Sequence, residues 1–134
     1  MDLIEFFSND HFARMAGIRL TEVSVGHAVA EMPITDVVLN ASGYCQGGAM
    51  FTLADLAFAA AVNTHERLTV SVNSNIAFLR AVSEGKLTAT ADELFDHHRL
   101  PFAYVRITNE AGELVALFSS SGYRRIEKRI ANNE

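Results

Sequence analysis

The stretch Gly47-Gly-Ala-Met-Phe-Thr-Leu-Ala-Asp-Leu-Ala-Phe-Ala-Ala-Ala-Val-Asn63 decides the fold, because it is long and apolar enough to form a helix inside a core. Asp55, at its middle, is the only formally charged residue between Asp36 and Glu66. Carboxylates removed from water are usually paired, protonated or functional. A hydrogen bond to neighbouring backbone, or a place on the wet edge of the helix, is the structural alternative. Asp55 is therefore our first candidate catalytic residue.

The composition limits the classes of function. The chain has 134 residues and is 49% hydrophobic, which predicts a single domain over residues 1–134. A net charge of −5 leaves no broad basic surface for nucleic acid or for an anionic membrane. The stretch from Gly47 to Val62 is shorter than the roughly 20 apolar residues of a membrane span. The acidic start of the chain and the single cysteine, Cys45, indicate a cytoplasmic protein without an intrachain disulfide. No spacing pattern marks Cys45 as a nucleophile.

Hydrophobic periodicity predicts an α+β fold. We expect a short amphipathic helix at the N-terminus, ended by Gly17, and a polar, fraying tail from Arg124 to Glu134. Between them we expect one central helix and five mostly antiparallel strands, the last two joined by a hairpin loop, over these ranges: strand Leu20–Ile34, bulged at Gly26; loop Asp36–Gln46; helix from Gly47; strands Leu68–Leu79, Leu87–Phe95, Phe102–Thr108 and Leu114–Tyr123; hairpin loop Asn109–Glu113. One helix leaves a sheet edge uncovered, so a second copy of the chain is a plausible cover.

The glycines at the start of the central helix are candidates for binding a developing negative charge. N–H groups in the first turn of a helix have no intrahelical partner, and glycine allows a ligand to come close. The alternative is that Gly47 and Gly48 only let the loop turn tightly. Gly47 and Asp55 are eight residues apart, which is about 12 Å along a helix axis. Acting on one carbonyl therefore requires Gly47 of one chain and Asp55 of another.

Two segments carry a family resemblance. Asn40-Ala-Ser-Gly-Tyr-Cys-Gln-Gly-Gly-Ala-Met-Phe-Thr-Leu-Ala-Asp-Leu-Ala-Phe58 resembles the signature of hotdog-fold acyl-CoA thioesterases of the phenylacetate-degradation (PaaI-like) type, whose pattern is Asn, a short loop, His-Gly-Gly, then Leu-Ala-Asp. Ser71-Val-Asn-Ser-Asn-Ile-Ala-Phe-Leu79 resembles the next strand of that family. Gln46 stands where the family has His, and an amide cannot titrate near neutrality.

The resemblance implies a hotdog fold, in which the sheet wraps around the helix, and hydrolysis of a CoA thioester at sites between subunits of a homodimer or of a tetramer of paired dimers. CoA is then part of the substrate, and no cofactor is expected. The implied roles are as follows: Asp55, nucleophile or general base; Gly47, oxyanion donor, with Gly48 beside it; Asn40, carbonyl orientation; Gln46, a supporting hydrogen bond; Ser71, water positioning, with Asn73 on the same strand face as the fallback.

The remaining ligand assignments rest on single residues. Arg80 and Lys86 flank a turn and are our candidates for the CoA phosphates, although surface cations commonly bind nothing specific. No metal is expected, because adjacent residues such as His97 and His98 point to opposite faces of a strand. An apolar acyl pocket is suggested by four residues that fit an ordinary core equally well: Met50, Phe51, Phe58 and Phe78. The acyl group, aromatic or aliphatic, stays open.

Other functional classes are compatible with parts of this pattern. A hotdog dehydratase would need a loop histidine, and the stretch from Val38 to Gly48 has none. A non-catalytic acyl-CoA sensor would lack the acid, which is present as Asp55. A structural dimerisation module would leave Asp55 unexplained.

Overall fold

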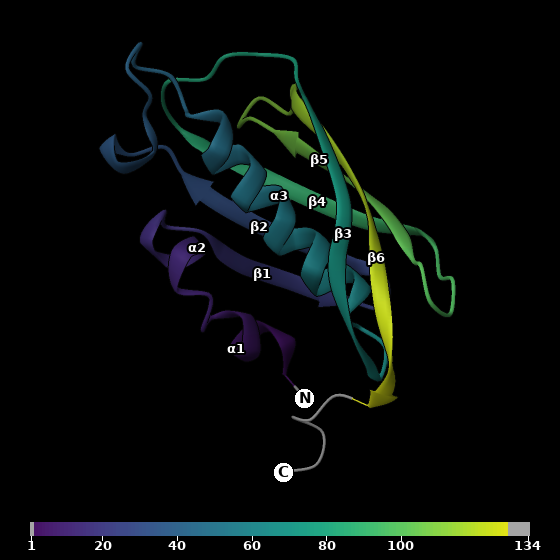
Figure 1. The fold of residues 1–134 in the computed structure, drawn as a ribbon. Coiled ribbons are helices and arrows are strands. Elements are labelled where there is room, and N and C mark those ends of the chain that lie inside the picture. The colour runs from purple at the N-terminus through teal and green to yellow at the C-terminus, as the bar shows by residue number, and fades with distance from the viewer. Residues whose placement is uncertain (1, 129–134) are drawn as a thin grey trace.

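The computed structural model describes residues 2–128, which form one six-stranded antiparallel sheet against a long helix (Figure 1). The strand order in the sheet is β1-β2-β4-β5-β6-β3. The elements, in chain order, are α1 (Leu3–Phe7), α2 (His11–Met15), β1 (Arg19–Ser24), β2 (His27–Pro33), the short 3-10 helix η1 (Asp36–Val38), α3 (Gly47–Val62), β3 (Arg67–Phe78), β4 (Lys86–Phe95), β5 (Phe102–Thr108) and β6 (Leu114–Lys128). The predicted α+β class is confirmed, with six strands in place of five.

The central helix α3 begins at Gly47, as predicted, and runs to Val62. It is apolar on nearly every side because the sheet curves around it, and Leu53 and Phe58 have no exposed surface. Asn63 ends the helix. Its buried side chain donates to the carbonyls of Ala59 (2.8 Å) and Thr69 (2.9 Å) and accepts from the N–H of Thr69 (2.9 Å). These bonds fix the direction in which β3 leaves the helix.

The first strand predicted from the sequence is in fact a hairpin of two strands. Gly26 has a φ of 69°, a left-handed conformation that glycine adopts without strain, and Ser24 pairs with His27 across the turn. The predicted bulge at Gly26 is therefore wrong, and the irregularity lies between Leu20 and Glu22 instead. Strand β2 ends at Pro33, one residue before the predicted end at Ile34.

The N-terminal segment forms two short helices where the sequence predicts one. Asp2 and Asp10 interrupt the pattern, since each caps a new helix by accepting backbone N–H bonds, from Ile4 (3.0 Å) and Ala13 (3.0 Å) respectively. Gly17, with a φ of 84°, follows the second helix as predicted.

Strand β3 changes its inward face partway along. A bulge between Ser71 and Asn73 inserts Val72 as an extra residue opposite β6. Before the bulge Thr69 is buried, and after it Ser74 bonds to the side chain of Ser120 (2.8 Å). Val70 and Val72 are exposed, so the outward face of β3 is apolar in its first half. Asn73, expected on the strand face of Ser71, lies on the opposite face because the bulge shifts the alternation.

The last strand continues beyond its predicted end. Strand β6 extends to Lys128, and Arg124 is only 6% exposed. The fraying predicted from Arg124 onward is wrong for residues 124–128, because β6 continues through them and Arg124 pairs with the buried carboxylate of Glu93. Residues 129–134 of that tail lie outside the described residues. Within residues 2–128, none of the helices combines the length and apolar character needed to cross a bilayer.

Candidate active site

Asp55 is partly buried on α3 and is paired with a side chain from another element. The Ser71 hydroxyl, on β3, donates to Asp55 Oδ1 at 3.0 Å. Burial raises the pKa of the Asp55 carboxyl above its usual range; the Ser71 hydrogen bond opposes this shift, and the negative charge of Asp10 adds to it. The partner of Asp55 is therefore a serine hydroxyl from another element and not neighbouring backbone, the first structural alternative raised from the sequence.

The N-terminus of α3 is open to a ligand. The side chain of Gln46, the N-cap residue, makes no capping bond to the helix. The N–H of Ala49 donates to the Gln46 carbonyl at 2.9 Å, which leaves the N–H groups of Gly47 and Gly48 for a ligand. A Cβ at Gly47 would lie 2.9 Å from the ring carbon Cζ of Phe78. The ring of Phe78 thus packs on the bare backbone of Gly47 and is itself 54% exposed. This end of the helix can donate hydrogen bonds to an oxyanion.

A cleft of about 430 Å³ opens beside Gly47. It is lined by Asn40, Tyr44, Cys45, Gly47, Met50, Phe78, Leu79, Arg80 and Ala81. Of the two predicted phosphate-binding cations, only Arg80 lies there, with an ion pair to Glu113 at 3.6 Å. Lys86 is not among the lining residues and pairs with Glu31 at 3.3 Å. The structure therefore brings Arg80, but not Lys86, to the cleft.

Asn40 shapes the loop that forms one wall of the cleft. Its Oδ1 accepts the N–H groups of Ser42 (2.9 Å) and Tyr44 (3.1 Å), and its own N–H donates to the Tyr44 carbonyl (2.7 Å). Both acceptor sites of the side-chain oxygen are thus used. The amide NH₂ of Asn40 is the group that can donate to a substrate carbonyl.

The Gln46 amide lies over the second glycine of the pair. A Cβ at Gly48 would lie 2.5 Å from Gln46 Oε1, so a larger residue at position 48 would make the Gln46 side chain move. Thr52 bonds back to the Gly48 carbonyl at 2.8 Å, the plain helical role that the sequence suggested. Gln46 is therefore placed at the helix N-terminus, where an amide can assist binding but cannot transfer a proton.

Within one chain the candidate residues form two separate groups. Asp55 and Ser71 are in contact, whereas Asn40, Gly47 and Arg80 line the cleft, and Asp55 is absent from its lining. The predicted acyl-pocket residues are mostly core. Phe58 is buried, and Phe51 packs edge-on against Phe118 with ring centroids 5.3 Å apart. Met50, although buried, and the exposed Phe78 line the cleft.

Comparison with known proteins identifies the family. Residues 42–116, more than half of the chain, match the sequence family described as the thioesterase superfamily. The chain belongs to the thioesterase superfamily. It is 35% identical to the acyl-coenzyme A thioesterase PaaI of Escherichia coli K12, over 88% of this chain and 85% of that protein. It is 33% identical to human acyl-coenzyme A thioesterase 13, over 79% of each chain.

The solved structures agree with this placement in the thioesterase superfamily. The structure of E. coli PaaI matches with a TM-score of 0.87 and 33% identity, covering 92% of this chain and 91% of that one. The predicted resemblance is thus confirmed, and the protein is a PaaI-like hotdog thioesterase. Its reaction class is the hydrolysis of a thioester.

In this thioesterase, Cys45 is built as an inert core residue. It is 5% exposed, and burial raises the pKa of its thiol to about 11. We expect the native protein to react slowly with dithionitrobenzoate at pH 8, and the urea-unfolded protein to react at once. A rapid stoichiometric reaction of the native protein would contradict this placement.

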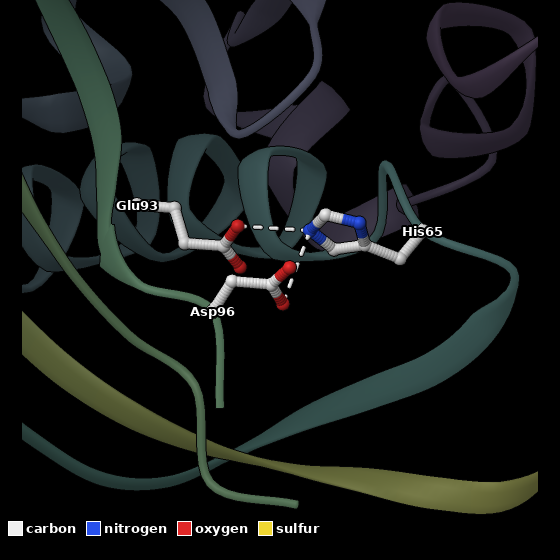
Figure 2. A group of neighbouring side chains, drawn as sticks. All are labelled: His65, Glu93 and Asp96. Carbon is white, nitrogen blue, oxygen red and sulfur yellow. Dashed lines mark hydrogen bonds and ion pairs between the residues drawn. The ribbon is translucent and has the colours of Figure 1, made fainter. Parts of the chain in front are cut away.

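A cluster of charged side chains that the sequence did not predict lies far from the N-terminus of α3. His65 Nε2 lies 2.8 Å from Glu93 Oε1 and 3.5 Å from Asp96 Oδ1 (Figure 2). Three such ligand atoms within 4.8 Å of one another could hold a metal ion. Arg124, however, already forms ion pairs with both carboxylates and offsets part of their negative charge. His65 and Arg124 are far in sequence from Glu93 and Asp96, so no spacing pattern predicts the cluster.

The adjacent histidines lie in the loop after β4, not on a strand as expected. The ring centroids of His97 and His98 are 4.4 Å apart with an angle of 32° between the planes, so the predicted opposite orientation is wrong. His97 Nδ1 accepts the N–H groups of Arg99 (3.0 Å) and Leu100 (2.9 Å). This nitrogen is thus occupied in shaping the loop.

Proposed function

We propose that this thioesterase hydrolyses acyl-CoA to the free acid and CoA, with Asp55 as the catalytic carboxylate. The observation that carries the proposal is the partly buried Asp55, which is held by Ser71 and lies on the same long helix that presents an N-terminus without a side-chain cap at Gly47. The relatives named acyl-coenzyme A thioesterases support CoA as the thiol. PaaI of E. coli belongs to the phenylacetic acid degradation operon, so an arylacetyl group such as phenylacetyl is our leading acyl candidate.

The residues divide the reaction between them. The Gly47 N–H and the Asn40 amide donate to the thioester oxygen and stabilise the oxyanion that forms on attack. Asp55 either removes a proton from water, whose hydroxide adds to the carbonyl carbon, or adds to that carbon itself. The carbon–sulfur bond then breaks, the CoA thiolate leaves, and in the second route water hydrolyses the acyl-aspartate. Ser71 positions the carboxylate and water, and Gln46 supports the substrate.

Two copies of the chain would complete each site. Gly47 and Asp55 are about 12 Å apart along α3, further than one carbonyl can bridge. Strand β3 is at one edge of the described sheet, where it pairs with β6 on one side. Two of its own apolar residues, Val70 and Val72, are exposed. A homodimer joined at this edge, with its helices antiparallel, would place Gly47 of one chain beside Asp55 of the other; dimers could pair further into a tetramer. A fully active monomer in sedimentation analysis would rule this out.

The proposed enzyme acts in the cytoplasm and meets the phosphates of CoA locally. The net charge of −5 offers no general attraction for an anion. Arg80 is the cation that lines the cleft beside Gly47. CoA is substrate in this scheme, and the steps above use no cofactor or metal.

Thiol release from a panel of CoA thioesters tests the proposed function. The panel contains acetyl-, octanoyl- and phenylacetyl-CoA, assayed with the purified wild-type chain at pH 7.5. Release of free CoA from at least one thioester is expected. Tight binding of acyl-CoA without release would instead indicate a sensor and would refute the catalytic proposal.

Replacing Ser71 with Ala is expected to shift the acid limb of the kcat/KM profile to higher pH. Asp55 must be ionised to act, and the Ser71 hydrogen bond lowers its pKa. Removing the hydroxyl therefore raises the pH at which half of the activity is reached. The control is Ser42→Ala, in an exposed part of the loop. If a folded Ser71→Ala variant keeps the acid limb of kcat/KM at the same pH, Ser71 does not set the pKa of Asp55.

A further inference from the structure

A second groove lies against the first turn of α3, next to the cleft that holds Arg80. Its volume is about 500 Å³, within the range of small-molecule sites. It is lined by Phe12, Met15, Ala16, Val37, Val38, Leu39, Gln46, Gly48, Ala49 and Thr52. None of these lining residues is charged, and the Thr52 hydroxyl is already bonded to the Gly48 carbonyl. The groove is thus suited to an apolar ligand.

The wall that α2 contributes presents large apolar side chains to solvent. Phe12 is 64% exposed and Met15 is 65% exposed, and Val37 opposite them is 66% exposed. The amphipathic helix expected for this segment would turn its apolar side chains toward the core. Instead, Ala13, which is 1% exposed, anchors α2 to the core, and the Asp10 cap fixes its start. Exposed apolar groups gathered on a rigid wall mark a binding surface.

The groove and the cleft meet at the same helix end. Gly47 lines the cleft with Arg80, whereas Gly48 and Gln46 line the groove. A CoA thioester has the same division, with an apolar acyl chain on one side of its carbonyl and an arm ending in phosphates on the other. A carbonyl bound at the N-terminus of α3 can therefore extend its acyl chain along the groove and its CoA arm through the cleft.

We propose that the groove between α2 and α3 binds the acyl chain of the substrate, and that Phe12 and Met15 set which chains fit. This inference rests on the proposed acyl-CoA substrate. It assigns specificity to a short helix that comes before the sheet in the chain. A second copy of the chain is the competing occupant of the groove, and the experiment separates the two.

Binding of two non-hydrolysable thioethers, S-octyl-CoA and S-ethyl-CoA, tests the groove without requiring turnover. The variants are Met15→Lys, which places a charge in the groove, and Phe12→Ala, which removes an apolar wall. Val25→Lys and Leu94→Ala make the same kinds of change at exposed apolar positions outside the groove. Isothermal titration gives the dissociation constants, and sedimentation gives the mass of each variant.

We expect Met15→Lys to weaken S-octyl-CoA binding at least about tenfold and S-ethyl-CoA binding less than about twofold. A change in how well an apolar group fits a hydrophobic pocket has an effect of this size. Phe12→Ala should also weaken S-octyl-CoA binding more than S-ethyl-CoA binding. Both control variants should have the dissociation constants of the wild type. An unchanged octyl-to-ethyl ratio would overturn the inference. So would an equal loss for both thioethers together with a fall in mass, which would assign the groove to a subunit contact. Octanoyl-CoA hydrolysis by the wild type, measured alongside, reports separately on the proposed reaction.

Discussion

Replacing Asp55 with Asn is expected to lower kcat for every hydrolysed thioester by about 10²- to 10⁴-fold, the usual contribution of a positioned acid or base. Asn has the same shape and can still accept the hydrogen bond that Ser71 donates to Asp55. It can neither take a proton from water nor attack a carbonyl. Initial rates of CoA release, measured beside the exposed-site control Asp36→Asn, check this result.

The same variant should not lose stability at neutral pH. The folded-state pKa of Asp55 is raised, so its protonated form is favoured in the fold and its ionised form is not. The stability that the carboxyl contributes is therefore present below its unfolded pKa of about 3.9 and is lost as the pH rises through the folded pKa. Asn removes the charge, so its Tm at pH 7 should equal or exceed that of the wild type, and the gap should close as the pH falls toward 4. A folded Asp55→Asn variant with full activity would falsify the assignment.

The largest stability effect is expected from replacing Arg124 with Met. Arg124 is 6% exposed, and its ion pairs with Glu93 and Asp96 are joined by a bond from its Nε to Thr69 Oγ1 at 3.3 Å. The Glu93 side chain is only 5% exposed, so the variant leaves a buried carboxylate without its arginine. Breaking one side of such a pair costs about 3 to 5 kcal/mol in the free energy of unfolding.

Urea unfolding at pH 7 measures this loss. The matched control is Arg106→Met on the exposed side of β5, for which a change within about 0.5 kcal/mol is expected. The double variant Arg124→Met with Glu93→Gln should recover part of the loss, because the buried charge is then gone as well. If Arg124→Met unfolds like the control, the cluster around His65 does not hold this end of the sheet.

The positions of the helices and strands could be predicted from the sequence better than the surroundings of their side chains. The long apolar run placed α3, and β5 has the bounds that its alternation predicted, because local patterns suffice for both. Gly26 was assigned to a bulge because one glycine fits a bulge and a tight turn equally well. Arg124 was assigned to a fraying tail because its acidic partners come from β4 and the loop after it, which periodicity cannot see.

Candidate site residues that lie on a single helix could be predicted from the sequence. Contacts between residues of two different elements could not. Asp55 and Gly47 follow from the helix alone. The family resemblance assigned Ser71 to the positioning of water, and the structure shows that its hydroxyl contacts Asp55. The prediction that Asn73 shares a strand face with Ser71 is wrong, because the extra residue Val72 reverses the alternation of side chains. A bulge of this kind cannot be recognised from a single sequence.

The side chain of Asn63 acts toward Thr69 as a neighbouring strand would, offering both an acceptor for its N–H and a donor for its carbonyl. The Asn63 side chain thereby replaces the backbone hydrogen bonds that a paired strand would make with Thr69. Ser71 follows Thr69 by two residues, so the turn cannot lengthen or twist without moving the hydroxyl away from Asp55. The pairing of these two groups is thus set during folding, before any substrate arrives, and a ligand need not spend binding energy to assemble it.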